Sequence, residues 1–79
     1  MPEKKARTYY KDSLALKSVG EKIREVRLSK QISIERLANE CEVDTSQIGR
    51  MELGKVNFSI SHLYLIAKAL QIHPKELLP

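Results

Sequence analysis

Two short stretches with helical spacing of apolar residues, at about 34–41 and 45–53, are separated by only three residues. A joint this short forces the two helices to cross at a steep angle. A chain of 79 residues therefore has to build its core around this pair. The inward positions are Leu37, Ala38 and Cys41 in the first stretch, and Ile48 and Met51 in the second.

The rest of the chain also repeats apolar residues with helical spacing, and strand-like alternation is missing. Helices are expected at about 16–30, at 60–70 after Ser59, and in a short last segment that begins at Pro74. Ser33 is the expected N-cap of the second helix, and Asp44 with Gln47 has the spacing of a capping box. The prediction is an all-α fold, a compact bundle of five helices.

Composition narrows the class of protein. Hydrophobic residues make up 42% and charged residues 30%, which is typical of a folded domain, and no apolar run approaches 18 residues. We therefore expect no membrane segment and a cytoplasmic location. Cys41 is the single cysteine, and His62 and His73 stand eleven residues apart without metal-ligand spacing. No metal, cofactor or catalytic residue is predicted, and an enzyme is not expected.

Positive charge is concentrated at the N-terminus. Residues 1–30 carry nine lysines and arginines against four acids, a net charge of +5, whereas residues 31–79 carry five against six, a net charge of −1. Residues 1–12 are predicted to form a flexible basic arm. Tyr9 and Tyr10 lie among its cations, and the arm either enters a neighbouring DNA groove or is a tail or partner contact.

From about residue 19 to residue 78 the sequence resembles the Xre family, the phage repressor and Cro type of helix-turn-helix domain. The matching stretches are VGEKIREVR (19–27), SIERLANECEVDTSQIGRMELGK (33–55), SISHLYLIAKAL (59–70) and IHPKELL (72–78). The resemblance covers about three quarters of the chain. It implies a DNA-binding domain of the phage-repressor type over residues 13–79, which follows the arm.

The resemblance also implies that residues 45–53 form the recognition helix, whose N-terminal part lies against base edges in the major groove. Arg50 is the strongest candidate reader, because its guanidinium can hold guanine O6 and N7 with two hydrogen bonds. Gln47 either pairs with adenine or spends its side chain on the capping box. The outward positions that would read bases are Thr45, Ser46, Gln47 and Arg50.

Phosphate contacts are implied on both sides of the recognition helix. The free amides that follow Ser33 would donate to one phosphate, beside its capping role. Lys55 and Asn57 would contact the DNA backbone without reading sequence, and a solvated loop lysine is the alternative for Lys55. Arg27 and Glu52 correspond to a buried structural ion pair that links the first helix to the end of the third.

Three residues depart from the family pattern. Ile34 stands where the family usually has a glutamine that bridges a phosphate and the recognition helix, and contact with a thymine methyl group is one replacement. Gly49 lies inside the recognition helix at a cost of about 1 kcal/mol relative to alanine, and it is expected to be a tolerated weak helix position, the alternative being that it lets the helix approach the DNA backbone closely. Phe58 replaces a common proline and is expected to fill the edge of the core or a partner surface.

The predicted function is a transcriptional regulator that binds a palindromic site in double-stranded DNA as a homodimer, similar to the controller proteins of restriction–modification systems. A dimer is expected because one recognition helix makes too few base contacts for useful specificity. The proposed interface is segment 74–78 with Phe58 or Tyr64 nearby. The main alternative is an antitoxin that binds a partner toxin and autoregulates its operon. A further one is a nonspecific nucleic-acid binder that uses the basic arm.

Overall fold

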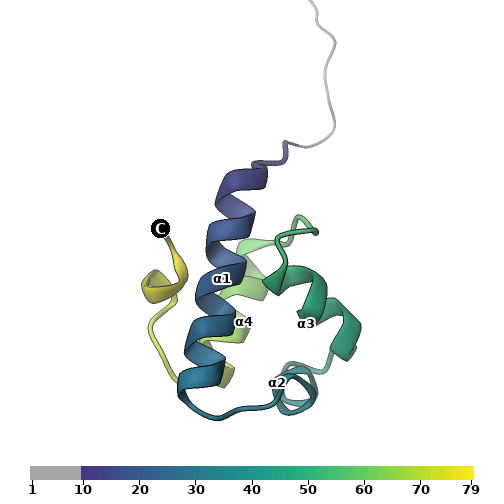
Figure 1. Cartoon of the computed structure of the whole chain (residues 1–79), viewed down its shortest axis with the longest axis vertical. Helices are drawn as coiled ribbons and strands as arrows, with labels where there is room; N and C mark the ends of the chain where they lie inside the picture. The colour runs from purple at the N-terminus through teal and green to yellow at the C-terminus, as the bar shows by residue number, and fades with distance from the viewer. Residues whose placement is uncertain (1–9) are drawn as a thin grey trace, which may run out of the picture.

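A computed structural model describes residues 10–79 of the chain, which are all helices and connecting turns with no strand among them. Residues 1–9 of the predicted arm lie outside the described residues. The elements are α1 (Ser13–Ser29), α2 (Ile34–Cys41), α3 (Thr45–Glu52), α4 (Ile60–Leu70) and a 3₁₀ helix, η1 (Pro74–Leu77). Figure 1 shows α1 along the middle of the molecule, with α2 and α3 on one side and the C-terminal turn on the other.

Local sequence accounts for where the helices begin. Asp12, Ser33 and Ser59 each accept a hydrogen bond from the third backbone amide that follows, at 3.0, 3.0 and 3.2 Å. These bonds satisfy amides that have no partner inside the helix. The capping box expected of Asp44 and Gln47 is wrong, because the Asp44 side chain makes no capping hydrogen bond.

The prediction of a fifth α-helix is also wrong, because residues 10–79 hold four α-helices and one short 3₁₀ helix. His73 and Glu76 do form a capping box around Pro74, so the segment starts as a helix does. Its bonds run from residue i+3 to residue i, as from Leu78 N to Lys75 O at 3.2 Å, and Leu78 is already extended. Four residues close a single turn and leave no room for an α-helical ladder.

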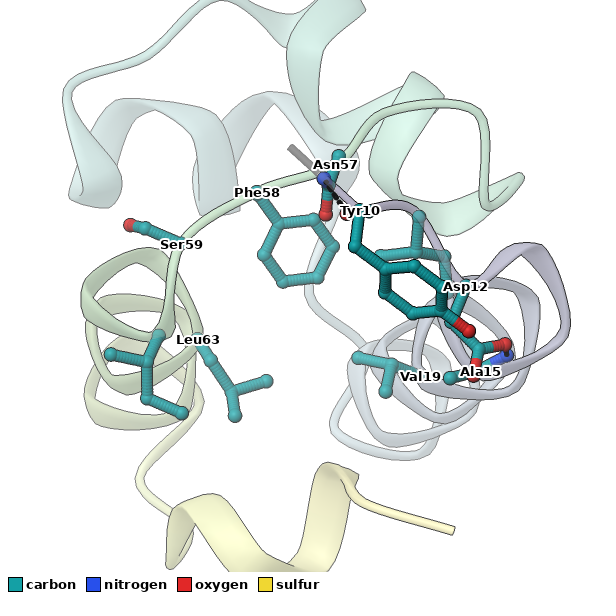
Figure 2. Close-up of a pocket in the computed structure, with 10 residues that line it drawn as sticks. Tyr10, Asp12, Ala15, Val19, Asn57, Phe58, Ser59 and Leu63 are labelled. Carbon is teal, nitrogen blue, oxygen red and sulfur yellow. Dashed lines mark hydrogen bonds between the residues drawn. The ribbon is translucent and has the colours of Figure 1, made fainter. Parts of the chain in front are cut away.

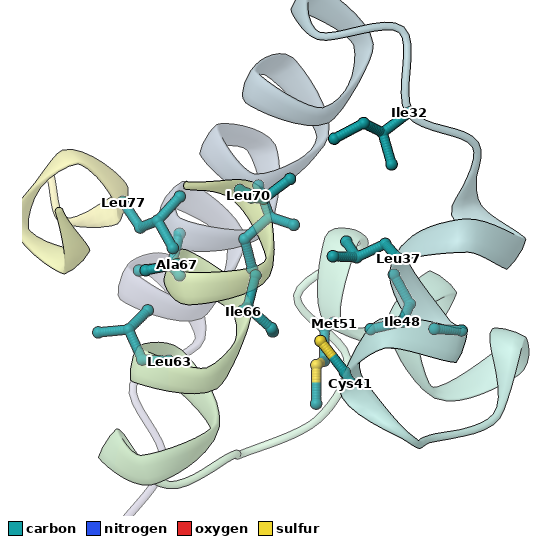
Figure 3. Packing of buried hydrophobic residues seen from close by; sticks show 13 residues of the cluster. Ile32, Leu37, Cys41, Ile48, Met51, Leu63, Ile66, Ala67, Leu70 and Leu77 are labelled. Carbon is teal, nitrogen blue, oxygen red and sulfur yellow. The ribbon is translucent and has the colours of Figure 1, made fainter. Parts of the chain in front are cut away.

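The core lies between α4 and the α2–α3 pair, and α1 and η1 close its sides (Figure 3). α4 contributes four buried residues at helical spacing, and Leu77 brings η1 against them, fully buried. Ile32, in the α1–α2 turn, is buried too, although the sequence analysis did not assign it to the core. The buried apolar residues are Val19, Ile23, Ile32, Leu37, Ala38, Cys41, Ile48, Met51, Leu63, Ile66, Ala67, Leu70 and Leu77.

Gly20 fixes how closely α1 approaches α3. A Cβ atom at this position would overlap the backbone carbonyl of Met51 and would lie 2.6 Å from the carbonyl oxygen of Glu52. Only glycine therefore permits this backbone-to-backbone contact. Gly54 has a left-handed conformation, with φ of 72°, and a Cβ there would lie 2.6 Å from Lys17 Cα. The C-terminal end of α3 thus packs closely against α1 because Gly20 on α1 and Gly54 just after α3 both lack a side chain.

Candidate nucleic-acid interface

The turn between α2 and α3 sets the geometry of the site. Glu42 takes a left-handed conformation with φ of 57°, and the Val43 amide donates back to the Ala38 carbonyl at 3.0 Å. This arrangement satisfies the end of α2 and reverses the chain within one residue. Asp44 is extended and starts α3 directly after the turn, so the two eight-residue helices pack against each other at a steep angle, with α2 seen nearly end-on and α3 lying across the view in Figure 1.

α3 has a buried side and an exposed side. Ile48 is fully buried, and Met51 and Glu52 lie with it on the inner side of the helix. Thr45, Ser46 and Arg50 are exposed on the opposite side, among the positions predicted to read bases. The helix therefore presents three polar side chains to solvent. Rotation of α3 about its axis would expose its buried residues, so the orientation of these side chains is fixed.

Gln47 is placed differently from the other predicted readers. Its side chain is half-buried, and it lines a hollow at the end of α2 together with Asn39, Glu42 and Asp44. The backbone amide of Gln47 donates to the Asp44 carbonyl at 2.9 Å. Gln47 is thus less exposed than Arg50 and lies next to two carboxylates that repel phosphate.

Arg27 and Glu52 form a buried ion pair between α1 and α3. Arg27 Nε donates to Glu52 Oε2 at 2.7 Å and Nη2 donates to Oε1 at 3.0 Å, while Nη1 donates to the Ile32 carbonyl at 3.0 Å. Both residues are only 8% exposed. The hydrogen bond with Glu52 raises the pKa of Arg27 above its usual value, although burial opposes the shift. The pair locks the C-terminal end of α3 and orders the α1–α2 turn.

The predicted phosphate-contacting residues take different environments. Ser33 is exposed at the start of α2, with its hydroxyl accepting the Arg36 amide. Lys55 is exposed just after α3. Asn57, in the same loop, donates from Nδ2 to the Tyr10 carbonyl at 2.8 Å (Figure 2). Its amide therefore ties the loop to the chain that enters α1.

Phe58 and Tyr10 both line a shallow hollow of about 240 Å³ between the start of α1 and the start of α4. The Phe58 ring points inward between Val19 and Leu63, and it packs against the core cluster (Figure 2). Of the two places expected for Phe58, the edge of the core is therefore the observed one. Tyr10 remains 71% exposed.

Two cations beside α3 were missed by the sequence analysis. Lys17 and Arg24 are exposed on α1, seven residues apart and hence on one face, and they line a groove of about 600 Å³ that also includes Gly49 and Leu53. The repeated basic residue at i and i+7 is visible in the sequence. Which helix it faces depends on the close packing at Gly20.

The cysteine and the two histidines are buried or hydrogen-bonded within the fold. Cys41 is buried, and burial raises the pKa of its thiol. His62 Nδ1 lies 2.9 Å from the Ser59 hydroxyl, and His73 Nδ1 accepts the Lys75 amide. No group of three potential metal ligands occurs within residues 10–79. Over the same residues, none of the helices combines the length and apolarity that a membrane crossing requires.

Comparison with known proteins assigns the class. The model of a helix-turn-helix family, HTH_3, matches residues 23–77, which include the whole α2–α3 unit and most of the core. The chain therefore belongs to the HTH_3 helix-turn-helix family, the Xre type of DNA-binding transcription regulator. The resemblance drawn from the sequence is confirmed.

Individual relatives narrow the comparison. Control protein C.BamHI of Bacillus amyloliquefaciens is 43% identical over 60 residues, 75% of this chain and 74% of that protein. The restriction–modification controller protein C.AhdI of Aeromonas hydrophila superposes with a TM-score of 0.77 at 38% identity, over 80% of this chain and 96% of that one. The hypothetical transcription factor NHTF from Neisseria gives a TM-score of 0.76 at 26% identity, over 95% and 87%.

Proposed function

We propose that this chain is a homodimeric regulator that reads a two-fold symmetric operator in double-stranded DNA through α3. The observation that carries the proposal is the outward side of α3, where Thr45, Ser46 and Arg50 are exposed while the inner side is anchored in the core. Arg50 makes no ion pair with another described residue, so its guanidinium is available to a base. A guanine in the major groove offers the two acceptors that this group needs.

Phosphate contacts on both sides of α3 would orient the helix in the groove. Of the three residues that the family pattern implies, we assign contacts to Ser33 and Lys55 and leave out Asn57, whose amide donates to the Tyr10 carbonyl. We add Lys17 and Arg24 from the groove beside α3. Each neutralised phosphate contributes about 0.9 to the slope of log affinity against log salt. Arg24→Gln is therefore expected to lower that slope by about one and to weaken binding to every sequence alike. An unchanged slope would remove Arg24 from the interface.

Dimerisation is proposed through the outer side of α4 and the start of η1. Tyr64 is 58% exposed and Leu65 is 37% exposed, and with Ile72 and Pro74 they line an open, mainly apolar groove of about 520 Å³. This surface overlaps the predicted interface at Tyr64 and Pro74, whereas Phe58 packs inward. Leu65→Lys should give a monomer in sedimentation equilibrium while retaining the helical circular dichroism of the wild type. A wild-type protein that is monomeric both free and on operator DNA would contradict the dimer.

The biological role is proposed from the relatives. C.BamHI is named a control protein and C.AhdI a restriction–modification controller, and their identity to this chain is 43% and 38%. We propose that this chain regulates transcription in a restriction–modification system. Occupancy of its operator would then follow the concentration of the dimer, since dimer formation and DNA binding are coupled by mass action.

The decisive experiment is selection of bound sites from random duplex DNA, at about 150 mM salt, a level at which nonspecific binding is weak. Wild type should select a motif with two-fold symmetry. Arg50→Ala should lose preference at one base pair per half-site, by about 1–3 kcal/mol. Lys22→Ala is the matched control, because it removes one cation from α1 at a position that pairs with Glu25 and does not line the groove. Failure of wild type to select any motif would refute the proposal.

A further inference from the structure

An apolar side chain at the start of α2, that of Ile34, lines the open groove beside α3. Ile34 is the first residue of α2 and is half-buried, with one side packed against the core and another lining the groove. Gly49 lies across from it on α3. A Cβ atom on Gly49 would lie 3.8 Å from Ile34 Cδ1, an ordinary van der Waals contact, so the glycine leaves a methyl-sized space beside the isoleucine.

Gly49 is not required by the protein's own packing. Ile34 Cδ1 is the only atom outside its own helix that a Cβ at Gly49 would meet within 4 Å among the described residues, in contrast to the backbone overlap at Gly20. Its backbone is helical, so glycine lowers helix propensity here without a compensating turn. Something outside the folded chain is therefore the better explanation for the missing side chain.

Charge around this space favours nucleic acid as the occupant. Lys17 and Arg24 rim the groove, against the carboxylate of Glu21, which forms no ion pair with another described residue, while Glu52 is neutralised by its ion pair with Arg27. A cationic rim suits phosphates, and an apolar floor suits a hydrophobic group between them. In the major groove the C5-methyl of thymine is the one apolar group that a base presents.

We propose that Ile34 and Gly49 form an apolar notch that reads the C5-methyl group of one thymine in each half-site. This inference rests on the proposed binding of α3 in the major groove. Ile34 supplies the contact, and Gly49 supplies the space that the methyl group enters. Ile34 is thus a specificity-determining residue in addition to the polar readers of α3.

Base-analogue substitution tests the contact one methyl at a time. Each thymine of the selected operator is replaced by deoxyuridine, which removes the methyl group and keeps all hydrogen bonds. Wild type should bind about fourfold more weakly at one position in each half-site, the effect of burying a single methyl-sized group. Ile34→Ala should bind thymine and uracil equally at that position. Ile60→Ala is the matched control, since Ile60 opens α4 as Ile34 opens α2 but does not line this groove.

A second variant guards against loss of folding. Gly49→Ala fits beside Ile34 without overlap and raises helix propensity, so the protein should remain folded in circular dichroism. It fills the notch and should also abolish the preference for thymine over uracil. If wild type selects a motif but shows no such preference, or if Ile34→Ala retains it, the notch is refuted while the proposed function stands. If no motif is selected, both are refuted.

Discussion

Neutralising Glu52 tests how its ion pair with Arg27 supports α3. In Glu52→Gln the side-chain shape is kept, but the guanidinium of Arg27 loses its counter-charge, and one of the two oxygens that accept its hydrogen bonds is replaced by an amide nitrogen that cannot accept. Because Arg27 and Glu52 are each 8% exposed, water cannot replace the lost charge. Removing one partner of a buried pair costs about 3–5 kcal/mol. A chain of this length holds about 4–12 kcal/mol in total, so the loss is severe.

Urea unfolding followed by circular dichroism measures this cost. With an m-value near 2 kcal/mol per molar, the midpoint of Glu52→Gln should fall by roughly 2 M. The double variant Arg27→Met with Glu52→Leu is the control, since it replaces both charges by apolar groups and should recover most of the stability. A loss below about 1 kcal/mol in Glu52→Gln, or a double variant less stable than the single one, would refute the argument that an unpaired buried charge dominates.

Three further perturbations follow from individual contacts. Gly20→Ala should cost about 3 kcal/mol in urea unfolding, because its Cβ overlaps backbone, whereas Gly49→Ala should be neutral or stabilising; equal effects would contradict the close crossing. Burial raises the pKa of the Cys41 thiol, so the folded state holds that proton more tightly, and the stability this contributes is lost as pH rises above about 8.5. If a Cys41→Ser variant loses the same stability at alkaline pH, the loss comes from a group other than the Cys41 thiol. Asn57→Ala should cost about 0.5–1.5 kcal/mol and shift the carbonyl carbon resonance of Tyr10, and an unshifted resonance would show that the bond is absent in solution.

The parts of the fold that depend on neighbours in sequence could be predicted from the sequence. Ser33 and Ser59 lie where the sequence predicts that helices begin, and each caps its helix by accepting from the amide three residues later. The inward and outward sides of α3 follow from the 3.6-residue period alone. The capping box at Asp44 failed, since a permissive spacing does not decide which rotamer the carboxylate adopts.

Contacts between distant segments could not be predicted this way. Gly20 is one of three isolated glycines in the sequence, and only the crossing of α1 over α3 explains it. The hydrogen bond from Asn57 to Tyr10 joins residues 47 positions apart, and no local pattern encodes it. Lys17 and Arg24 become candidate phosphate contacts only because that crossing puts their face of α1 beside α3.

The division of α3 into two sides explains how such a fold can change specificity without losing stability. An eight-residue helix is too short to be stable alone, so α3 exists because Ile48, Met51 and Glu52 are held by the rest of the protein. Thr45 and Arg50 contribute little to that anchorage, and substitutions at exposed positions usually change stability by less than about 0.5 kcal/mol. The residues proposed to read bases can therefore vary while the core and ion pair stay fixed. Ile34, at the start of α2, both packs against the core and lines the groove beside α3, so a substitution in the proposed notch at this residue would also change packing.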